Sequence, residues 1–277
     1  MRTRVLPLIT ALIVCLAGAV IALPGMGFVA AAEAQTPAIP AVAPPEHATA
    51  PLASAQPRLA GERRRPIIDL AAAASAGVSS HVLDLAMGAV RCAVQSGDLA
   101  SPSSLTLIDY SRPSTEPRLW VFDLRTGELR FRELVAHGKG TGENLAEHFS
   151  DELNSHQSSL GLFVTRDTYV GANGYSLRLD GLEAGFNSRA MERAIVMHGA
   201  PYVTETVAAT QGRLGRSWGC PALREAVARD VIDFVRGGGV VFSYYPDQTW
   251  LEQSRFLHCT PGDLDDLGEV PSLVTRQ

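Results

Sequence analysis

Residues 118–135 read RLWVFDLRTGELRFRELV, and this stretch indicates the fold class. Apolar and aromatic residues predominate in 118–124, and a second strand-like run occupies 128–135. The connection between them, Arg125-Thr126-Gly127, is short and contains a turn glycine. Two β-branched or aromatic runs joined in this way are typical of a β-hairpin. The sequence therefore predicts antiparallel β-structure near the middle of the chain.

Outward from the hairpin, the pattern remains strand-rich. Further strand-like segments lie at 160–165, 175–179, 193–197 and 240–245, and the strands are expected to begin near Leu105. The clearest helix is predicted over 222–236, where apolar residues recur at i, i+4 and Gly237 follows as a C-terminal cap. Upstream, the Ala-rich segment 67–95 has Leu and Val at helical spacing and predicts one or two helices. Many strands with few helices predict a mainly β (α+β) single domain with helices at its edges.

The N-terminal segment has the pattern of an export signal. Arg2 and Arg4 precede an apolar run at 5–20, and Ala32-Glu33-Ala34 fits the small-x-small cleavage pattern. The run 5–32 is also long enough to span a bilayer, so an uncleaved membrane anchor is the alternative. Cys15 lies inside the apolar run after a bulky residue, which argues against a lipoprotein signal. Either form predicts a protein of the periplasm or cell envelope.

The domain organisation follows from these composition shifts. The Ala/Pro-rich segment after the signal has too few large apolar residues to bury, and we expect it to act as a tether. The expected parts are a signal peptide at 1–34, a linker at 35–66, an N-terminal helical segment at 67–104, the main domain at 105–260 and a tail at 261–277.

Charge and cysteine content restrict the function further. The net charge is −5, and the only run of basic residues, Arg63–Arg65, falls in the expected linker, which argues against a nucleic-acid partner. Cys15 would leave with the signal, so Cys92, Cys220 and Cys259 remain in an oxidising compartment. An odd number predicts one disulfide and one free thiol. If Cys220 must stay free, Cys92 and Cys259 are the pair; the alternative is that both are reduced core thiols.

The most informative segment is Gly215-Arg216-Ser217-Trp218-Gly219-Cys220-Pro221. Cys220 directly precedes the predicted helix, and proline is well suited to the first helical position. A thiol at a helix N-terminus has a lowered pKa, because the macrodipole stabilises the thiolate. Gly219 would allow close approach of a substrate, and the amides beside Cys220 could stabilise an oxyanion. The alternative is a buried structural cysteine, the usual role of a lone Cys.

His198 is the candidate general base. It follows the predicted strand at 193–197, where a histidine is more often a core or turn residue. A nucleophile candidate downstream favours the catalytic interpretation, since pairing with histidine is a standard way to activate a thiol. Only Glu205 stands between the two as a possible third member, so a backbone carbonyl or Ser217 is expected to orient the ring.

Three other interpretations use the same residues. Gly215-x-Ser217-x-Gly219 matches the nucleophile elbow of α/β-hydrolases, but that motif requires a strand before the Ser and a helix immediately after it. A zinc site from His137, His198 and Cys220 lacks closely spaced ligand pairs. The glycine-rich stretch 138–142 lacks the spacing of a phosphate-binding loop and is expected to be a tight or mobile loop. No metal ion or cofactor is expected.

Several segments in order resemble the L,D-transpeptidase catalytic domain (YkuD-type), in particular the murein L,D-transpeptidase branch. They are Met197-His198-Gly199-Ala200 and the segment 215–222, together with His137-Gly138-Lys139-Gly140, 158–161, 175–179 and 244–247. The resemblance extends over about 105–259. It implies that 105–260 is a β-sandwich-like catalytic domain preceded by a helical segment, with a helix after the catalytic Cys.

The resemblance also implies roles for individual residues. Cys220 would be the nucleophile and His198 the base, with Ser217 and Gly219 lining the thiol and the Gly219 and Cys220 amides forming the oxyanion hole. The better-known branch has His before the Gly-Cys pair and Arg two positions after the Cys, where this chain has Trp218 and Ala222. Contacts to substrate are expected from Arg216, the candidate for the substrate carboxylate, and from Gly199, Tyr202, Trp218 and His137.

The implied function is a peptidoglycan L,D-transpeptidase that forms a thioester on tetrapeptide stems. If water instead of an amine resolves the thioester, the same site is an L,D-carboxypeptidase. The expected partners are peptidoglycan stem peptides and an envelope protein as a second kind of acyl acceptor, and the expected state is a monomer. The departures at Trp218 and Ala222 are the best support for the rival, a non-catalytic peptidoglycan-binding protein that keeps the fold.

Overall fold

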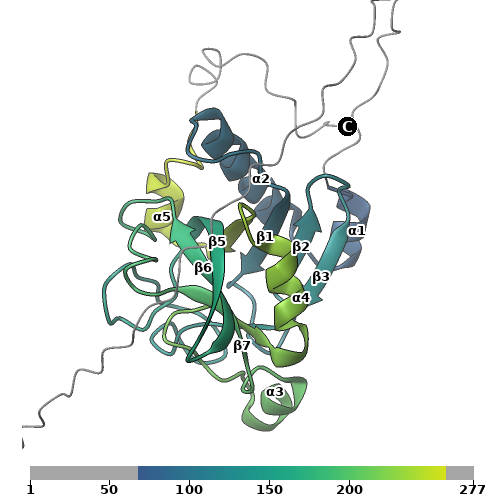
Figure 1. Cartoon of the computed structure of the whole chain (residues 1–277), viewed down its shortest axis with the longest axis vertical. Coiled ribbons are helices and arrows are strands. Elements are labelled where there is room, and N and C mark those ends of the chain that lie inside the picture. The colour runs from purple at the N-terminus through teal and green to yellow at the C-terminus, as the bar shows by residue number, and fades with distance from the viewer. Residues whose placement is uncertain (1–67, 260–277) are drawn as a thin grey trace, which may run out of the picture. The chain divides into compact units, whose positions relative to one another are not determined.

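A computed structural model describes residues 68–259 (Figure 1). The expected signal peptide and linker and the C-terminal tail lie outside the described residues. Within 68–259 no helix is both long enough and apolar enough to cross a membrane. The described residues all belong to one compact unit.

The predicted hairpin is confirmed. Strand β2 (Leu119–Asp123) pairs antiparallel with β3 (Leu129–Glu133), and Gly127 in the connection has a φ of 81°, which glycine adopts without strain. On its other side β2 pairs antiparallel with β1 (Ser104–Asp109), and β1 pairs in parallel with β9 (Val240–Tyr244). The sheet thus begins as a locally connected meander and then incorporates a strand from the end of the domain.

The remaining strands complete a mainly β fold, as predicted. They are β4 (Val135–Ala136), β5 (Gly161–Gly171), β6 (Gly174–Gly181), β7 (Val196–Ala200) and β8 (Ala222–Arg224). Within the described residues the order is β3-β2-β1-β9-β5-β6-β7-β8-β4. Only Leu134 separates β3 from β4, so the two ends of this order are one continuous segment and the sheet closes on itself. The Arg224 side chain, at the end of β8, donates to Glu133 of β3 at 2.8 and 2.9 Å across this closure.

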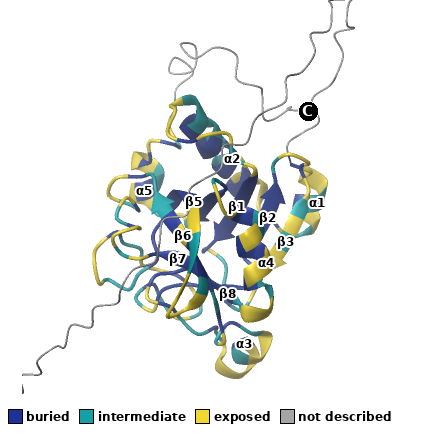
Figure 2. Ribbon diagram, viewed as in Figure 1, coloured by how far each residue is buried: buried dark blue, intermediate teal, exposed yellow. Residues whose placement is uncertain are grey.

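Both faces of the central strands are buried. Along β2, Trp120 and Phe122 belong to one hydrophobic cluster and Leu119 and Val121 to another, as expected for side chains that alternate between faces. Figure 2 shows β1 and β2 as buried throughout, whereas much of α3 is exposed. A strand covered on both sides shows no apolar–polar alternation, which explains the continuous apolar runs in the sequence.

Helices cover these two faces. The helical segment predicted at 67–95 forms α1 (Leu70–Ser75) and α2 (Ser80–Gln95), and α2 shares its cluster with β1 and β9. Helix α4 (Glu225–Val235) packs through Val231, Ile232 and Val235 on the other face. Two short helices that the sequence did not indicate complete the described elements, α3 (Glu205–Gln211) and α5 (Gln248–Gln253).

A disulfide joins the first large helix to the end of the domain. Cys92 on α2 is bonded to Cys259, which follows α5, with their Cα atoms 5.8 Å apart and a sequence separation of 167. This is the pair that the count of cysteines predicts, and Cys220 is the free cysteine of the described residues. The bond fixes α2 and the C-terminal segment on the same side of the sheet.

Candidate functional site

Cys220 does not lie at a helix N-terminus, so that prediction was wrong. Residues 222–224 form β8, which pairs in parallel with β7 and antiparallel with β4, and α4 begins only at Glu225. The apolar pattern at 222–224 fits a strand as well as a helix, and pairing with two neighbours decides for the strand. The helix end was predicted well: α4 ends at Val235, and Gly237 follows with a φ of 76°. The macrodipole of α4 therefore does not act directly on the thiol to lower its pKa.

The thiol of Cys220 is buried, with 8% of the residue exposed. Its Sγ accepts from the Val196 backbone N–H at 3.4 Å and donates to the Ala194 carbonyl oxygen at 3.7 Å. Burial raises the pKa of the thiol, while the Val196 hydrogen bond and the charge of Arg193 act in the opposite direction. In this structure Cys220 is therefore a protonated thiol held against the chain that leads into β7.

His198 lies in the middle of β7 and not at the end of a strand, because β7 begins three residues later than predicted. In the parallel pairing of β7 with β8, His198 is opposite Ala222, two residues after the cysteine. Its Nδ1 lies 2.9 Å from the Gly199 carbonyl oxygen, which can only accept, so Nδ1 carries the proton and Nε2 has the free lone pair. The expectation of a backbone carbonyl as the orienting group is met by Gly199.

The electrostatics of His198 suit a base. Burial lowers the pKa of its imidazole, and the hydrogen bond to Gly199 opposes this shift. The ring is therefore neutral at physiological pH. The hydrogen bonds of the described residues include none between His198 and Cys220, so the structure shows a neutral thiol and a neutral imidazole, not an ion pair.

Ser217 closes the loop that carries the thiol. Its hydroxyl is buried, donates to the Cys220 carbonyl oxygen at 2.6 Å and accepts from the Gly219 N–H at 3.1 Å. This arrangement supports a positioning role next to the thiol. It contradicts the nucleophile-elbow interpretation, since the segment before Ser217 is irregular and a β-strand, not a helix, follows it.

The predicted oxyanion hole is only partly present. The Gly219 amide is already bonded to Ser217, whereas the Cys220 amide has no hydrogen-bond partner among the described residues. Gly219 has a φ of 121°, and a Cβ there would lie 2.8 Å from the Gln157 carbonyl oxygen. The position therefore requires glycine for two reasons, backbone conformation and close approach.

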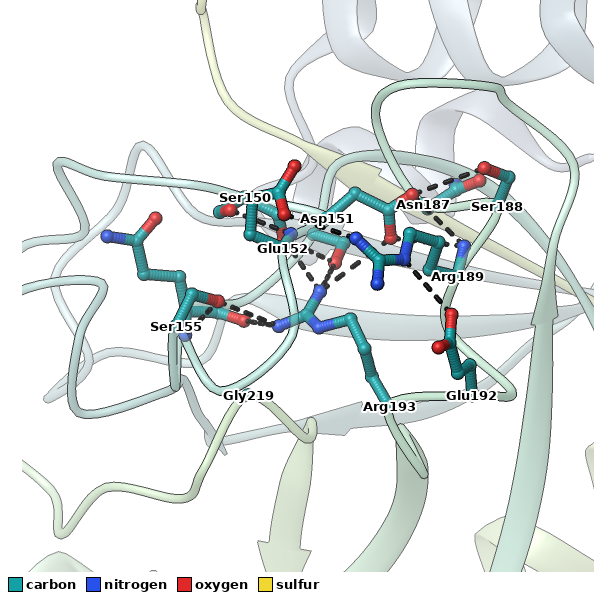
Figure 3. A network of polar contacts seen from close by, with 12 residues as sticks. Ser150, Asp151, Glu152, Ser155, Asn187, Ser188, Arg189, Glu192, Arg193 and Gly219 are labelled. Carbon is teal, nitrogen blue, oxygen red and sulfur yellow. Dashed lines mark hydrogen bonds and ion pairs between the residues drawn. The ribbon is translucent and has the colours of Figure 1, made fainter.

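A buried ion pair that the sequence did not indicate lies next to the cysteine loop, residues 215–221 (Figure 3). The Arg193 side chain is 3% exposed and lies 3.8 Å from Asp151, whose side chain is 6% exposed. Arg193 donates to the Ser150 and Gln157 carbonyl oxygens at 2.7 and 2.6 Å and to two serine hydroxyls, those of Ser155 and Ser159. The guanidinium thus ties the 150–159 loop together.

Arg193 also reaches the cysteine loop. Its Nη2 atom would be 3.4 Å from a Cβ built on Gly219, and its charge acts on the thiol of Cys220. Among the described residues the non-glycine positions with positive φ are Asn154 (58°), His156 (55°) and Ala194 (53°). Two of them lie in the loop that Arg193 holds, and the third is the next residue in the chain. Strained backbone of this kind persists where the surrounding structure enforces it, and it concentrates at functional sites.

The residues expected to contact substrate fall into different environments. Trp218 is 70% exposed, and Tyr202 is half-buried, where burial and the nearby Cys220 raise the pKa of its hydroxyl to about 12. Arg216 is close to the site but bound to Glu143 at 2.6 Å and to the Gly142 carbonyl at 2.9 Å. The structure therefore does not present Arg216 as a free cation for a substrate carboxylate.

Gly199 and His137 both contribute to packing and hydrogen bonding within the fold. A Cβ on Gly199 would meet Ala228 of α4 at 3.0 Å, so this glycine allows the helix to pack closely on β7. His137 is 1% exposed, and its Nδ1 lies 2.8 Å from Nη2 of the fully buried Arg118, which also donates to the Val135 carbonyl. Burial and the Arg118 charge lower the pKa of His137 to about 4. The buried His137 ring is thus engaged by Arg118, and the substrate contact predicted for Gly199 stays a prediction.

The zinc interpretation also loses its third ligand. Nδ1 of His137 must accept from the Arg118 guanidinium, so Nε2 carries the proton and donates to the Gly142 carbonyl at 3.3 Å. Both ring nitrogens are thus in use. Within 68–259 no group of three or more His, Cys, Asp or Glu side chains is arranged to hold a metal ion.

Comparisons with known proteins identify a family for this chain. A family model described as L,D-transpeptidase catalytic domain matches residues 74–244, a range that includes most of the N-terminal helical segment. A search of curated proteins finds no match. Among solved structures, an L,D-transpeptidase from Mycobacterium smegmatis is 15% identical with a TM-score of 0.34, covering 52% of this chain and 59% of that one.

Two further solved structures are similar. An L,D-transpeptidase from Stackebrandtia nassauensis is 16% identical over 60% of this chain and 67% of its own, with a TM-score of 0.31. The helical cell shape determining protein Pgp2 from Campylobacter jejuni is 12% identical over 56% and 55%, with a TM-score of 0.32. This chain covers less than two thirds of the M. smegmatis protein. Because the family model spans more than half of the chain, the protein belongs to the family of L,D-transpeptidase catalytic domains.

Proposed function

We propose that this protein is an exported cysteine L,D-transpeptidase that acts on peptidoglycan tetrapeptide stems, with Cys220 as nucleophile and His198 as general base. The observation that carries the proposal is the tautomer of His198. Because Nδ1 donates to the Gly199 carbonyl, Nε2 is free to take a proton. His198 lies on β7, which pairs with β8, the strand that directly follows the loop carrying Cys220. Family membership supports a peptidoglycan peptide as substrate.

The chemistry would proceed in two halves. As the Cys220 Sγ attacks the amide carbonyl carbon, its proton passes to Nε2 of His198 and a C–S bond forms. The oxyanion that develops would be met by the Cys220 amide. When the C–N bond breaks, the leaving amine takes the proton from His198, and a thioester remains. An amine of a second stem then attacks the thioester and gives a proton to Nε2 of His198, a new amide forms, and the C–S bond breaks as the sulfur takes that proton to restore the thiol.

The neutral resting pair fits this order of events. A buried thiol with a raised pKa is a weak nucleophile until its proton is removed. His198, with its lowered pKa, holds no proton of its own at neutral pH and can accept one. The thiol must leave the Ala194 carbonyl to reach Nε2, so we expect a bound substrate to bring the two side chains together.

The outcome of the second half distinguishes a transpeptidase from its close alternative. If water instead of an amine attacks the thioester, the same residues give an L,D-carboxypeptidase. Mass spectrometry of muropeptides after incubation with the protein separates the two: cross-linked dimers are expected, whereas shortened monomers alone would favour the carboxypeptidase. Unchanged muropeptides would favour a non-catalytic peptidoglycan-binding protein.

The proposed location rests on the N-terminal sequence alone. Arg2, Arg4 and the site after Ala34 favour export and cleavage, which would place the mature protein in the periplasm or cell envelope. N-terminal sequencing of the protein from cells is expected to begin near Gln35. Recovery of Met1 on a membrane-bound form would favour the uncleaved anchor instead.

A further inference from the structure

Lys139 is the single lysine of the chain, against 23 arginines. It is exposed and lies beside the cysteine loop, since its backbone N–H donates to the Ser217 carbonyl oxygen at 2.8 Å. Lysine carries a compact charge on a flexible stem and differs from arginine in how it binds anions. A chain that otherwise uses arginine therefore places its one lysine side chain next to the loop that carries Cys220.

Trp218 is the exposed partner of this lysine. The chain has three tryptophans, and Trp120 and Trp250 are both fully buried, whereas Trp218 is 70% exposed. The Lys139 Nζ lies 5.2 Å from the centre of the Trp218 ring, and the His156 imidazole stacks on that ring at 4.9 Å with an interplanar angle of 27°. A large exposed aromatic ring held by two neighbours offers a preformed surface for a ligand.

The backbone connects all three residues to the nucleophile. Gly138 forms a parallel bridge with Ser217, and the Gly140 N–H donates to the His156 carbonyl oxygen at 2.9 Å. Trp218 lies two residues before Cys220 in the same loop. The loop from His156 onward belongs to the segment that Arg193 holds, close to Gly219 in Figure 3. The backbone of all three residues is thus held next to the loop that carries the thiol.

The charge at this position is unpaired. Glu143 forms ion pairs with both Arg213 and Arg216, at 2.8 and 2.6 Å, so these arginines have a partner. Lys139 forms no ion pair with any described residue. It lines one side of an open hollow of about 380 Å³, together with Arg216, His148 and the two glutamates Glu143 and Glu147. Neither glutamate forms an ion pair with Lys139, so its ammonium group is available to a carboxylate of a ligand.

We propose that Lys139, Trp218 and His156 form a subsite that binds a carboxylate of the peptidoglycan stem peptide, the ammonium group meeting the charge and the indole ring the adjoining aliphatic chain. This inference rests on the proposed function and names the group that would hold the substrate carboxylate in place of Arg216. Losing one partly exposed charge contact is expected to weaken binding about 3- to 10-fold.

The chain's composition makes the first test specific. In the full chain with Cys220→Ala, an amine-acylating reagent can modify one side chain, Lys139, besides the N-terminal α-amine, which serves as internal reference. A tetrapeptide stem with free carboxylates is expected to slow modification of Lys139 relative to the α-amine. The same stem with its carboxylates amidated is not. Equal modification of Lys139 in the presence and absence of both peptides would overturn the proposal.

A second test uses the single exposed tryptophan. Iodide should quench Trp218 and leave the two buried tryptophans unaffected, and the stem with free carboxylates should protect Trp218. Lys139→Met should lose most of this protection and raise KM for the stem about 3- to 10-fold, whereas Lys139→Arg should restore both. Arg130→Met, which removes an exposed charge from β3, is the matched control and should leave both unchanged.

The carboxylate subsite and the proposed catalytic function can be refuted independently. If the stem acylates Cys220 in the otherwise unaltered chain but Lys139→Met binds it normally, the subsite is refuted and the proposed function remains. If the stem never acylates Cys220, the proposed function fails, yet protection of Lys139 by the stem still reports on the subsite.

Discussion

Replacing Arg193 by methionine should both destabilise the fold and make the Cys220 thiol less acidic. Methionine keeps much of the volume and removes the charge and all the donors. The guanidinium is 3% exposed, forms four hydrogen bonds within the 150–159 loop and pairs with Asp151. The variant therefore leaves one buried carboxylate without its cation, next to the loop that carries the nucleophile.

The size of the effect follows from this environment. Removing one partner of a buried ion pair costs about 3–5 kcal/mol, because the remaining charge has lost both water and its partner. Asp151 keeps some compensation from the Arg189 backbone N–H at 3.0 Å and the Ser188 hydroxyl at 3.2 Å, which argues for the lower end, about 3 kcal/mol. For a domain of this size that corresponds to a fall in Tm of roughly 6–12 °C.

Two assays separate a structural role from a role at the thiol. Thermal unfolding measures the stability loss in Arg193→Met and Arg193→Lys. The rate of alkylation by iodoacetamide against pH reports the thiol pKa, which should rise in Arg193→Met. It should return towards the unaltered value in Arg193→Lys, even if stability does not. If Arg193→Met keeps both the Tm and the alkylation profile of the unaltered protein, the reasoning about this ion pair is refuted.

The remaining predictions concern the catalytic pair and the disulfide. Because burial raises the pKa of Cys220, alkylation of the unaltered protein should still be accelerating above pH 8.5, and a plateau reached near neutrality would indicate a thiolate–imidazolium pair instead. Because the pKa of His198 is lowered, acylation by a carbapenem should persist as the pH falls through 6.5, where an unperturbed histidine would lose its activity. His198→Ala should slow that acylation by roughly 10²–10⁴-fold, measured by stopped-flow absorbance; an unchanged rate would exclude it as the base. Replacing Cys92 and Cys259 by alanine should lower the free energy of unfolding by about 4–5 kcal/mol in the chain-entropy model, given the loop of 167 residues, and an unchanged urea midpoint would contradict this.

Local patterns in the sequence predict the parts of the fold that local interactions determine. The hairpin at 118–135 was located closely because turn chemistry and strand propensity lie in the same few residues. The first turn of the helix predicted at 222–236 was wrong for the opposite reason. Residues 222–224 join two distant strands, and no local signal reports pairing with a segment some ninety residues upstream.

The residues of the candidate site were likewise predictable only where they lie close together in sequence. Cys220, Ser217 and Gly219 were identified together because they share one short motif. Arg193 and Asp151 are separated by more than forty residues, and one arginine among 23 has no distinguishing context. One feature of the sequence could have indicated the ion pair. Residues 150–159 are mostly polar and have neither strand nor helix character, and such a segment needs polar partners to hold it in place.

The expected substrate contacts show where residue type alone misleads. Arg216 and His137 have side chains suited to binding anions, yet neighbours in the fold occupy both. Lys139 stands out in the sequence only through its glycine-rich loop and the segment His137-Gly138-Lys139-Gly140. That it forms no ion pair with a described carboxylate depends on the fold, in which Glu143 binds the two arginines instead. Charge availability is a property of the neighbours and not of the residue.

The most direct test of the account is to identify the residue that carries the acyl group. The protein is incubated with a tetrapeptide stem or a carbapenem, the adduct is trapped at acidic pH, and its mass is mapped to a peptide. The predicted result is an adduct on Cys220 that is absent from Cys220→Ala and retained in Ser217→Ala. An adduct on Ser217, or full activity in Cys220→Ala, would contradict the cysteine mechanism.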